Sequence, residues 1–231
     1  MVKLAWDETG KKLYETGTDR GVLYPMDENG AYPLGVAWNG LTKVSESPDG
    51  AEETALYANN SKYLGLMSAE NFKGTIEAYT YPKEFEACDG SAEIAKGVTI
   101  GQQTRAPFGL TYRTLIGNDV KENAYGYKLH LVYGCKVSPS ERGYETVNDS
   151  PSAITFSWSF SATPVEVEGF NKTASWVIDS TAVDETALKA LESALYGGDE
   201  AATAHLPAPS ELLTILKTTT QKRTASPTNG K

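Results

Sequence analysis

The longest alternating pattern in this 231-residue chain runs from Pro107 to Val137 and predicts two β-strands joined by a polar turn. Side chains of a strand point alternately to its two faces, so a half-buried strand shows apolar residues at every second position. The positions that we expect on one face are Phe108, Leu110, Tyr112, Thr114 and Ile116 in the first strand and Tyr127, Leu129, Leu131, Tyr133, Cys135 and Val137 in the second. The polar positions of the opposite face are Thr111, Arg113, Lys128, His130 and Lys136. Both strands exceed the usual length of about 5–6 residues, which indicates a sheet larger than a small monomer needs.

The most regular alternation lies between Ala153 and Thr163, where the sequence reads AITFSWSFSAT. One face carries Ile154, Phe156, Trp158 and Phe160, and the other carries Thr155, Ser157, Ser159 and Ser161. The aromatic face is typical of a core-facing strand. A face lined with hydroxyl groups suits either solvent or the wall of a channel that must not hold its contents.

Shorter alternating segments separated by turn residues predict several more strands. The expected strands are Gly21–Met26, Gly35–Ser47, Phe72–Tyr81, Val98–Gln102 and Ser175–Asp179, together with a hairpin of Glu52–Ala58 and Lys62–Ser68 through Asn59–Ser61. Residues 1–20 are polar and alternate only weakly, so we expect an N-terminal arm with one strand. The polar segment from Ser45 to Ala55 is expected to be a long loop between strands.

Helices are predicted only in short stretches, mostly late in the chain. A helix is expected over residues 184–196, with Asp184 as its N-cap and three leucines at helical spacing before Gly197. Shorter helical segments are expected over 83–87 and 209–216, and residues 217–231 are expected to be a flexible tail. The predicted fold is mainly β (α+β), with residues 1–216 forming a single domain and one flanking C-terminal helix.

Composition excludes several classes of protein. The chain has a formal net charge of −9 and a pI near 4.8, which argues against tight binding to nucleic acid because such binding depends on lysine and arginine. Its two cysteines, Cys88 and Cys135, are too few for a disulfide framework. The sequence shows neither a signal peptide nor a membrane span, so we expect synthesis in a reducing cytosol and no membrane partner.

Sequence motifs for catalysis or metal binding are missing. The two histidines, His130 and His205, lie far apart, and no H-x-x-x-H or C-x-x-C spacing occurs. The sequence contains no phosphate-binding loop, no G-x-S-x-G motif and no G-x-G-x-x-G motif. We therefore expect no enzyme, no metal and no cofactor.

Two weaker alternatives use residues that also have a plain structural interpretation. Neighbouring carboxylates could serve a glycoside hydrolase, although such clusters arise readily on the surface of an acidic protein; they are Glu77, Glu84, Glu86 and Asp89. The tryptophans could form a carbohydrate-binding platform on a β-sandwich, although their strand-like surroundings favour core packing; they are Trp6, Trp38, Trp158 and Trp176.

Several blocks of the sequence, taken in order, carry a family resemblance. They are GVAWNGLTKVSESPDGAE (35–52), IEAYTYPKEFEACDG (76–90), GVTIGQQTRAPFGLTYRTLIGND (97–119), YGYKLHLVYG (125–134), TVNDSPSAITFSWSFSATPV (146–165) and WVIDSTAVDETALKALESALYG (176–197). The chain resembles the major tail protein, or tail tube protein, of siphophage-type tailed phages. The resemblance extends over nearly the whole chain except its extreme termini.

The resemblance implies a tail-tube fold, in which two packed β-sheets form a sandwich or partial barrel. It implies a virion structural protein, made in the host bacterial cytoplasm, whose copies form stacked and typically hexameric rings around a channel for double-stranded DNA. The implied partners are other copies of the chain, a tape measure protein, and tail terminator and distal tail proteins. A tail-like bacteriocin built from the same kind of subunit remains an alternative.

Two sets of residues acquire an expected role from this resemblance. In relatives a long loop reaches a neighbouring subunit or ring, and the corresponding residues are Ser45, Glu46, Ser47, Pro48, Asp49, Gly50, Glu52 and Glu53. The N-terminal arm and the basic tail are further candidates for that role. The hydroxyl-bearing residues Thr155, Ser157, Ser159 and Ser161 are the candidates for the channel wall, whereas the long hairpin is expected to act as scaffold.

Overall fold

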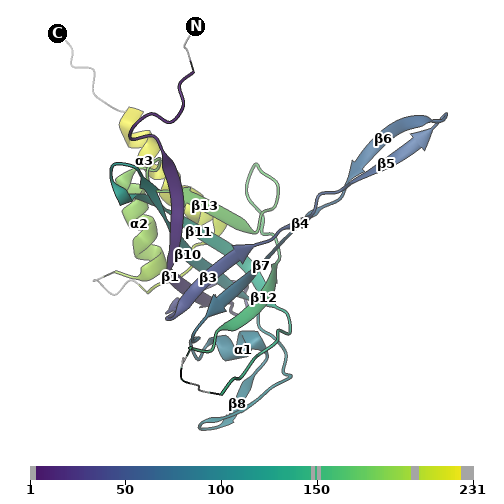
Figure 1. Cartoon of the computed structure of the whole chain (residues 1–231), viewed down its shortest axis with the longest axis vertical. Coiled ribbons are helices and arrows are strands. Elements are labelled where there is room, and N and C mark those ends of the chain that lie inside the picture. The colour runs from purple at the N-terminus through teal and green to yellow at the C-terminus, as the bar shows by residue number, and fades with distance from the viewer. Residues whose placement is uncertain (1–3, 147–148, 150–151, 199–202, 225–231) are drawn as a thin grey trace.

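The computed structural model describes residues 4–146, 149, 152–198 and 203–224, with the backbone alone described over 218–224. Strands dominate, which confirms the predicted mainly β, α+β class (Figure 1). The strands are β1 (Leu13–Pro25), β2 (Val36–Ala37), β3 (Leu41–Glu46), β4 (Asp49–Gly50), β5 (Glu53–Ala58), β6 (Ser61–Met67), β7 (Glu70–Ala78), β8 (Ala92–Ala95), β9 (Val98–Ile100), β10 (Phe108–Asn118), β11 (Glu122–Val137), β12 (Phe156–Ala162) and β13 (Ser175–Asp179). The helices are α1 (Phe85–Asp89), α2 (Glu185–Tyr196) and α3 (Pro209–Thr224).

Nine strands form one antiparallel sheet that curls towards a barrel. Its main path runs β2-β1-β10-β11-β12-β7-β3, with β13 paired to β11 and β4 paired to β7. The two ends of this path, β2 and β3, are neighbours in sequence, joined by the turn at Trp38–Gly40, and the Trp38 N–H donates to the Gly21 carbonyl at 2.8 Å. No ladder joins β2 to β3 among the described residues, so the curl stays open.

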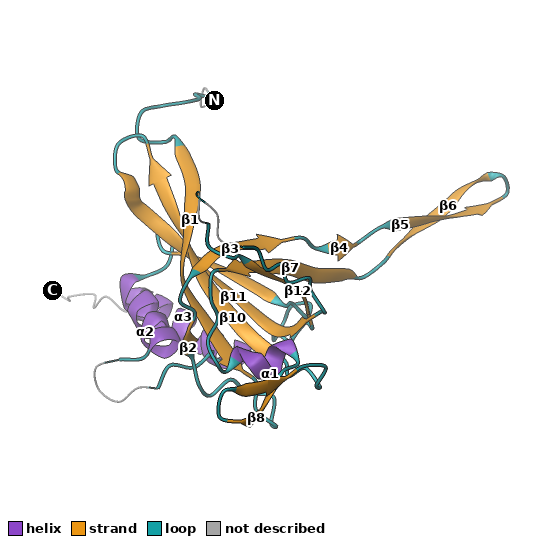
Figure 2. Cartoon of the chain, turned by 60° about the horizontal axis from the view of Figure 1, so that its bottom comes forward, coloured by secondary structure: helices purple, strands orange, loops and turns teal. Residues whose placement is uncertain are grey.

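The curl encloses one hydrophobic core, to which α1 contributes, and α2 and α3 cover a second core on its outer side. Figure 2 shows α2 and α3 together on one side of the sheet and α1 apart from them. An aromatic cluster fills the inside, where Trp38, Phe85 and Trp158 pack with ring centroids 4.6–5.8 Å apart. Leucines of α2 and Leu212 of α3 pack on β1, β11 and β13 to form the outer core. The curled sheet places two layers of strands on opposite sides of the inner core. This is the sandwich or partial barrel that was expected.

The hairpin predicted over Pro107–Val137 exists as β10 and β11, but its predicted faces are wrong. Opposite residues of an antiparallel pair share a face, and the register places Thr111 against Leu131 and Tyr112 against His130. Leu131 lies in the outer core while Leu110 lies in the inner one. The apolar positions of the two strands therefore face opposite sides of the sheet, and both sides are buried.

A bulge at Gly134 then reverses the alternation of β11. Two steps along β10, from Phe108 to Leu110, correspond to three steps along β11, from Cys135 back to Val132. Gly134 has φ of +61°, and a Cβ there would lie 2.6 Å from the Thr163 carbonyl oxygen, so only glycine fits without strain. Cys135 consequently faces the inner core, whereas Leu131 faces the outer one.

Both chain ends carry more regular structure than the sequence predicts. Strand β1 begins at Leu13, inside the expected N-terminal arm, and pairs with β10 as far as Pro25. Helix α2 agrees with its prediction, and the Asp184 carboxylate accepts a hydrogen bond of 2.9 Å from the Thr186 N–H. Helix α3 continues to Thr224, so the prediction of a flexible tail from residue 217 is wrong up to that point. Residues 225–231 lie outside the described chain.

Candidate assembly surfaces

A hairpin arm projects from the body of the protein (Figures 1 and 2). We define the arm as residues 51–69, which contain β5 and β6. Its turn is made by Asn59 and Asn60, whose φ angles of 50° and 61° suit the tight two-residue turn that asparagine tolerates. This confirms the hairpin predicted around residues 59–61. Because the arm extends away from the sheet, its side chains cannot add to either core.

The prediction of a long polar loop from Ser45 to Ala55 is wrong, because that segment forms the paired base of the arm. Ser45 and Glu46 belong to β3, Asp49 and Gly50 form β4, and Glu53 opens β5. The Ser47 N–H donates to the Lys73 carbonyl at 2.8 Å, so the ladder with β7 continues past Pro48. Residues 47–50 of this ribbon are all exposed, and their sequence is therefore polar without apolar alternation.

A partly buried polar cluster holds the base of the arm to the central hairpin. The Tyr112 hydroxyl donates a hydrogen bond to the Glu46 carboxylate, and the His130 ring stacks on Tyr112 with centroids 4.6 Å apart. The imidazole Nδ1 lies 3.7 Å from Glu46 Oε1, while Nε2 lies 3.0 Å from the Thr114 hydroxyl. His130, and to a smaller extent Tyr112, hold the pKa of Glu46 below its ordinary value. Glu46 is thus engaged within its own chain.

One face of the arm is lined by leucines, and the other carries an ion pair together with the exposed side chains of Tyr57 and Met67. Leu56 lies opposite Leu64, and Leu66 follows on the same face. On the other face the Glu53 carboxylate lies over Gly65, where a Cβ would collide with it, and forms an ion pair with Lys62. The three leucines are 40–52% exposed. The alternating sequence predicted this hairpin, but it gave no sign that the leucines stay uncovered within the chain.

The hydroxyl-bearing residues predicted as channel wall lie on one face of a three-stranded region. Alternation along β12 agrees with the prediction, since Trp158 and Phe160 are buried while Ser159 and Ser161 are exposed. Ser157 is half-buried, and Thr155 is exposed just before the strand. This arrangement leaves the channel role of these residues a prediction.

Neighbouring strands extend this polar face in rows. Ser159 lies beside Thr75, which lies beside Ser45, and this aligns three hydroxyl groups across β12, β7 and β3. The flanking rows carry charge, with Lys43 3.3 Å from Glu77 and Lys73 paired with Asp49. The face also includes Lys136, next to Ser161. Lysines outnumber acids here, so the negative charge of the chain is not concentrated on this face.

A second small hairpin projects at the lower end of Figure 1 and is made of β8 and β9. We call residues 92–100 the foot. Its exposed apolar side chains are Ile94, Val98 and Ile100. The Glu93 carboxylate ties the foot together by accepting a hydrogen bond of 2.9 Å from the Gly97 N–H, and it also pairs with Lys83.

The carboxylates considered for catalysis are engaged in ion pairs or lie on one short helix. Glu77 of β7 pairs with Lys43 of β3, while Glu84, Glu86 and Asp89 lie at or within α1, where the buried Asp89 pairs with Arg142. The two histidines belong to different parts of the chain. His205 Nε2 lies 3.3 Å from Glu211 Oε1, whereas His130 lies in β11. Over the described residues no group of three or more histidine, cysteine or acidic side chains could hold a metal ion. Both cysteines are buried and free, and burial raises the pKa of the Cys88 thiol to about 12.

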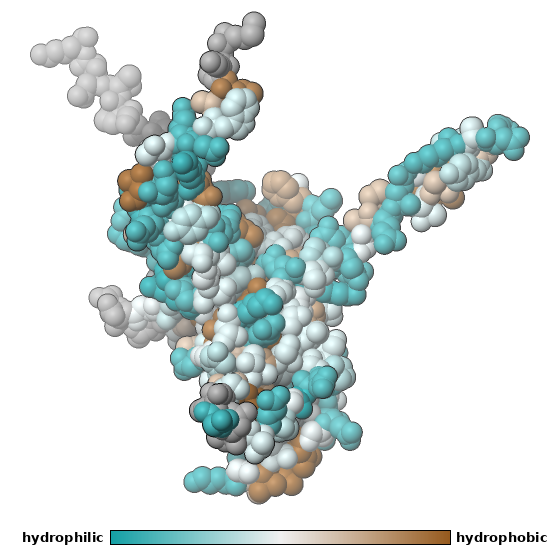
Figure 3. All heavy atoms as spheres, in the orientation of Figure 1, coloured by the Kyte–Doolittle hydropathy of each residue, from teal (hydrophilic) through white to brown (hydrophobic). Residues whose placement is uncertain are grey.

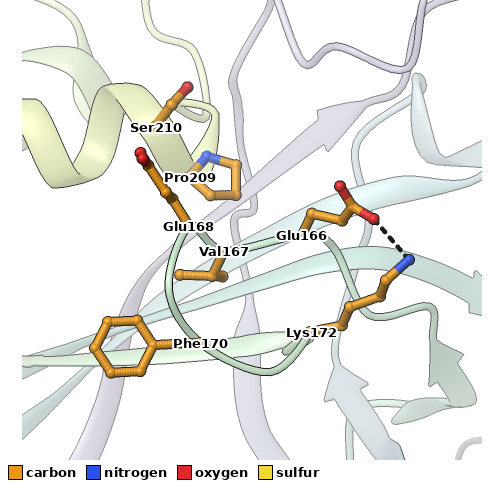
Figure 4. Close-up of a pocket in the computed structure, with 7 residues that line it drawn as sticks. All are labelled: Glu166, Val167, Glu168, Phe170, Lys172, Pro209 and Ser210. Carbon is orange, nitrogen blue, oxygen red and sulfur yellow. Dashed lines mark ion pairs between the residues drawn. The ribbon is translucent and has the colours of Figure 1, made fainter.

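A hollow of about 560 Å³ near the start of α3 gathers two carboxylates but does not form an acid–base pair (Figure 4). Glu166 is bound to Lys172 at 2.9 Å, and Glu168 lies at the other end of the hollow below Ser210. Phe170 points to the side of the hollow (Figure 4). The Glu166 carboxylate and its lysine neutralise each other at an exposed site, which is ordinary for a protein surface.

The tryptophans do not make a binding platform in the described part of the chain. Trp38 and Trp158 are buried in the inner core, and Trp176 packs against the outer core. Trp6 alone is largely exposed, which corrects the expectation that it packs in a core. Among the described residues, no helix is long and apolar enough to span a bilayer.

Comparisons with known proteins give no family assignment. No protein-family model matches the chain, and no curated protein matches it. One similar solved chain belongs to the cryo-EM structure of the anti-feeding prophage baseplate, with 9% identity, a TM-score of 0.35, and coverage of 77% of this chain and 97% of that one. Another belongs to the sheath–tube complex of PVC, an extracellular contractile injection system, with 9% identity, a TM-score of 0.31, and coverage of 69% and 88%. Likenesses this low carry no argument, so the function has to be inferred from the chain itself.

Proposed function

We propose that this chain is the tube-forming subunit of a long, non-contractile phage tail, in which copies close into rings and the rings stack around a channel for double-stranded DNA. The observation that carries the proposal is the arm, an uncovered apolar hairpin that projects from a folded body. An isolated two-stranded hairpin is at best marginally stable in water. An arm of this kind gains stability when a neighbouring molecule covers it, which favours an assembly subunit over a free monomer.

Open sheet edges support the same proposal. Strands β3 and β13 are each paired on one side, within the described residues, to β7 and β11 respectively. Unpaired backbone groups at a sheet edge are available to another chain, and closing a ring of subunits satisfies them. The β13 edge belongs to the body, whereas β3 leads through β4 into the base of the arm, so ring closure through β13 and contacts of the arm can use different surfaces.

The hydroxyl row at Ser45, Thr75 and Ser159 suits the channel wall in this proposal. Short hydroxyl side chains offer weak, neutral contacts, whereas a dense lysine surface would retain phosphate. Two of the lysines on this face are neutralised by Glu77 and Asp49, which limits the attraction for DNA. The sequence resemblance adds the tape measure, tail terminator and distal tail proteins as proposed partners, and the virion tail as the proposed location.

Removing the arm tests the proposal directly. Gly50 pairs with Glu70 at the base of the ladder, so residues 51–69 can be replaced by an Asn-Gly turn that joins two paired positions. We expect this variant to keep the circular dichroism and unfolding midpoint of the native subunit but to form no tubes by negative-stain microscopy. A Lys62→Ala variant with the arm intact is the control and should assemble.

Two outcomes would contradict the proposal. Tubes of normal length and yield from the armless variant would show that the arm is dispensable. A native subunit that remains a monomer at high concentration, and in the particles from which it comes, would exclude a tube-forming role.

A further inference from the structure

The foot, like the arm, is a two-stranded ribbon with exposed aliphatic side chains. Ala92 pairs with Ile100, and Val98 lies two residues before Ile100 on the same side of β9. The opposite face carries Glu93 and Thr99, which pair with each other. Glu93 is bound to Lys83 of the body, so the polar face of the foot is engaged within the chain while its apolar side chains remain exposed.

The two ribbons lie on different parts of the molecule, and one chain cannot bring them together. In Figure 3 the foot forms an apolar patch at the lower end of the body, and the arm extends from the upper right of the body with apolar and polar residues along it. Figure 2 likewise shows the arm and the foot pointing away from each other. A second copy of the chain, however, offers a foot to the arm of the first.

We propose that the leucine face of the arm (Leu56, Leu64 and Leu66) packs on the exposed aliphatic side chains of the foot (Ile94, Val98 and Ile100) of a second copy. This inference rests on the proposed function and names the surface that receives the arm. Each ribbon presents three aliphatic side chains on a two-stranded support, and two such layers pack face to face about 10 Å apart. The opposite faces carry the ion pairs Glu53–Lys62 and Glu93–Lys83 and take no part in this contact.

The geometry also favours this pairing over contact between two arms. An arm-to-arm contact uses the same surface on both molecules and closes as a two-fold dimer. Contact between different surfaces leaves a free arm at one end and a free foot at the other, so it repeats from copy to copy. Repetition of this kind is what a ring or a filament requires.

Cross-linking between two copies that carry different engineered cysteines tests the pairing of the arm with the foot. Leu64→Cys and Val98→Cys subunits are co-assembled and treated with a bis-maleimide whose spacer is about the 10 Å between packed sheets. Native Cys88 and Cys135 are buried and do not compete for the reagent. We expect a cross-linked dimer in the mixture and none from either variant alone. Lys62→Cys with Thr99→Cys, on the opposite faces of the same ribbons, is the matched control and should give none.

The possible results distinguish a failure of the arm–foot pairing from a failure of the tube-forming role. If tubes form and contain a cross-linked dimer joined through residue 64 of one copy and residue 98 of another, the result supports the pairing. Tubes that give a 64–64 product, or no product although mass spectrometry shows both cysteines labelled, overturn it and leave the tube-forming role intact. Failure of the native chain to form rings or tubes overturns the proposed function itself, and this pairing with it.

Discussion

The hairpin of β10 and β11 and the hairpin of the arm are built from the same kind of pattern, yet their apolar residues have opposite fates. Leu110 and Leu131 are fully buried, one in each core. Leu56 and Leu64 in the arm lie opposite one another across a ladder and are 40% and 43% exposed, respectively. Similar local sequences therefore serve the stability of the subunit in one place and are left available for a partner in the other.

Whether a hairpin buries its apolar residues depends on the strands and helices that lie next to it. Strands β1, β12 and β13 extend the sheet on either side of β10 and β11, and helices cover its outer face. The arm has neighbours on neither edge and neither face among the described residues, apart from the ribbon at its base. Mutations in β10 and β11 should accordingly change the stability of the subunit, and mutations in the arm should change its assembly into tubes.

The largest expected difference separates the core from the arm. Trp158→Ala removes the centre of the inner aromatic cluster and should lower the free energy of unfolding by about 3–5 kcal/mol. Leu64→Ala, in the arm, should change it by less than about 0.5 kcal/mol while reducing tube yield. Urea unfolding of the dilute subunit measures both.

A Trp158→Phe variant serves as the control for this pair. It keeps a ring in the cluster and removes a buried indole N–H that has no hydrogen-bond partner in the described structure. We expect it to cost less than Trp158→Ala. If Leu64→Ala destabilised the dilute subunit as strongly as Trp158→Ala, the distinction between the two hairpins would be lost.

An intermediate effect is expected at the bulge that reverses the faces of β11. Gly134→Ala places a Cβ against the Thr163 carbonyl at a positive φ and should cost about 1–3 kcal/mol in unfolding free energy. Gly97→Ala in the foot is the matched control, because Gly97 has φ of +77° but no heavy atom within 4 Å of the added Cβ. Thermal unfolding of both variants separates the collision from the backbone strain that they share. Equal losses would mean that the contact with Thr163 contributes nothing.

The smallest expected effect is a pH-dependent one at the base of the arm. Because the pKa of Glu46 is lowered in the folded protein, its carboxylate stabilises the fold above the ordinary pKa near 4.5, and this contribution is lost as the pH falls below that value. Glu46→Gln should therefore cost at most about 1 kcal/mol at pH 7, since the group is partly exposed. The difference from the native protein should shrink between pH 5 and pH 3 in urea unfolding.

Tyr112→Phe provides the comparison for Glu46. It removes the hydroxyl that donates to the carboxylate but leaves the ring on which His130 stacks. We expect a smaller and similarly pH-dependent loss. A Glu46→Gln effect that stayed constant from pH 7 to pH 3 would show that the carboxylate charge does not stabilise the base of the arm.

Much of the local structure could be predicted because its causes lie within a few residues. Asp184 caps α2 through its own neighbour, Thr186, and leucines at helical spacing cover one face of that helix. Asn59 and Asn60 make the turn of the arm because both tolerate a positive φ. The alternation in β12 separates Trp158 from Ser159 by the geometry of a strand alone.

The candidate site could be predicted only in part. The contact region predicted at Ser45–Glu53 forms the base of the arm, and its contact role stays a prediction; the exposed leucines lie further out along the arm. A polar ribbon such as Asp49–Gly50 gives no apolar alternation, so its pairing with β7 was not visible in the sequence. Leucines such as Leu64 look like core residues in any hairpin, and the foot residues gave no signal beyond a short strand.

The sequence by itself determined the strand-rich class, the turns and caps, and the alternation of side chains, because these follow from backbone sterics and short-range hydrogen bonds. Tertiary structure alone decided which face of each strand meets which core. That choice depends on register, and one bulged residue at Gly134 moves Cys135 to the other side of the sheet. Tertiary structure also decided that Leu56 and Leu64 stay uncovered, because burial requires a second layer and the chain places none over the arm.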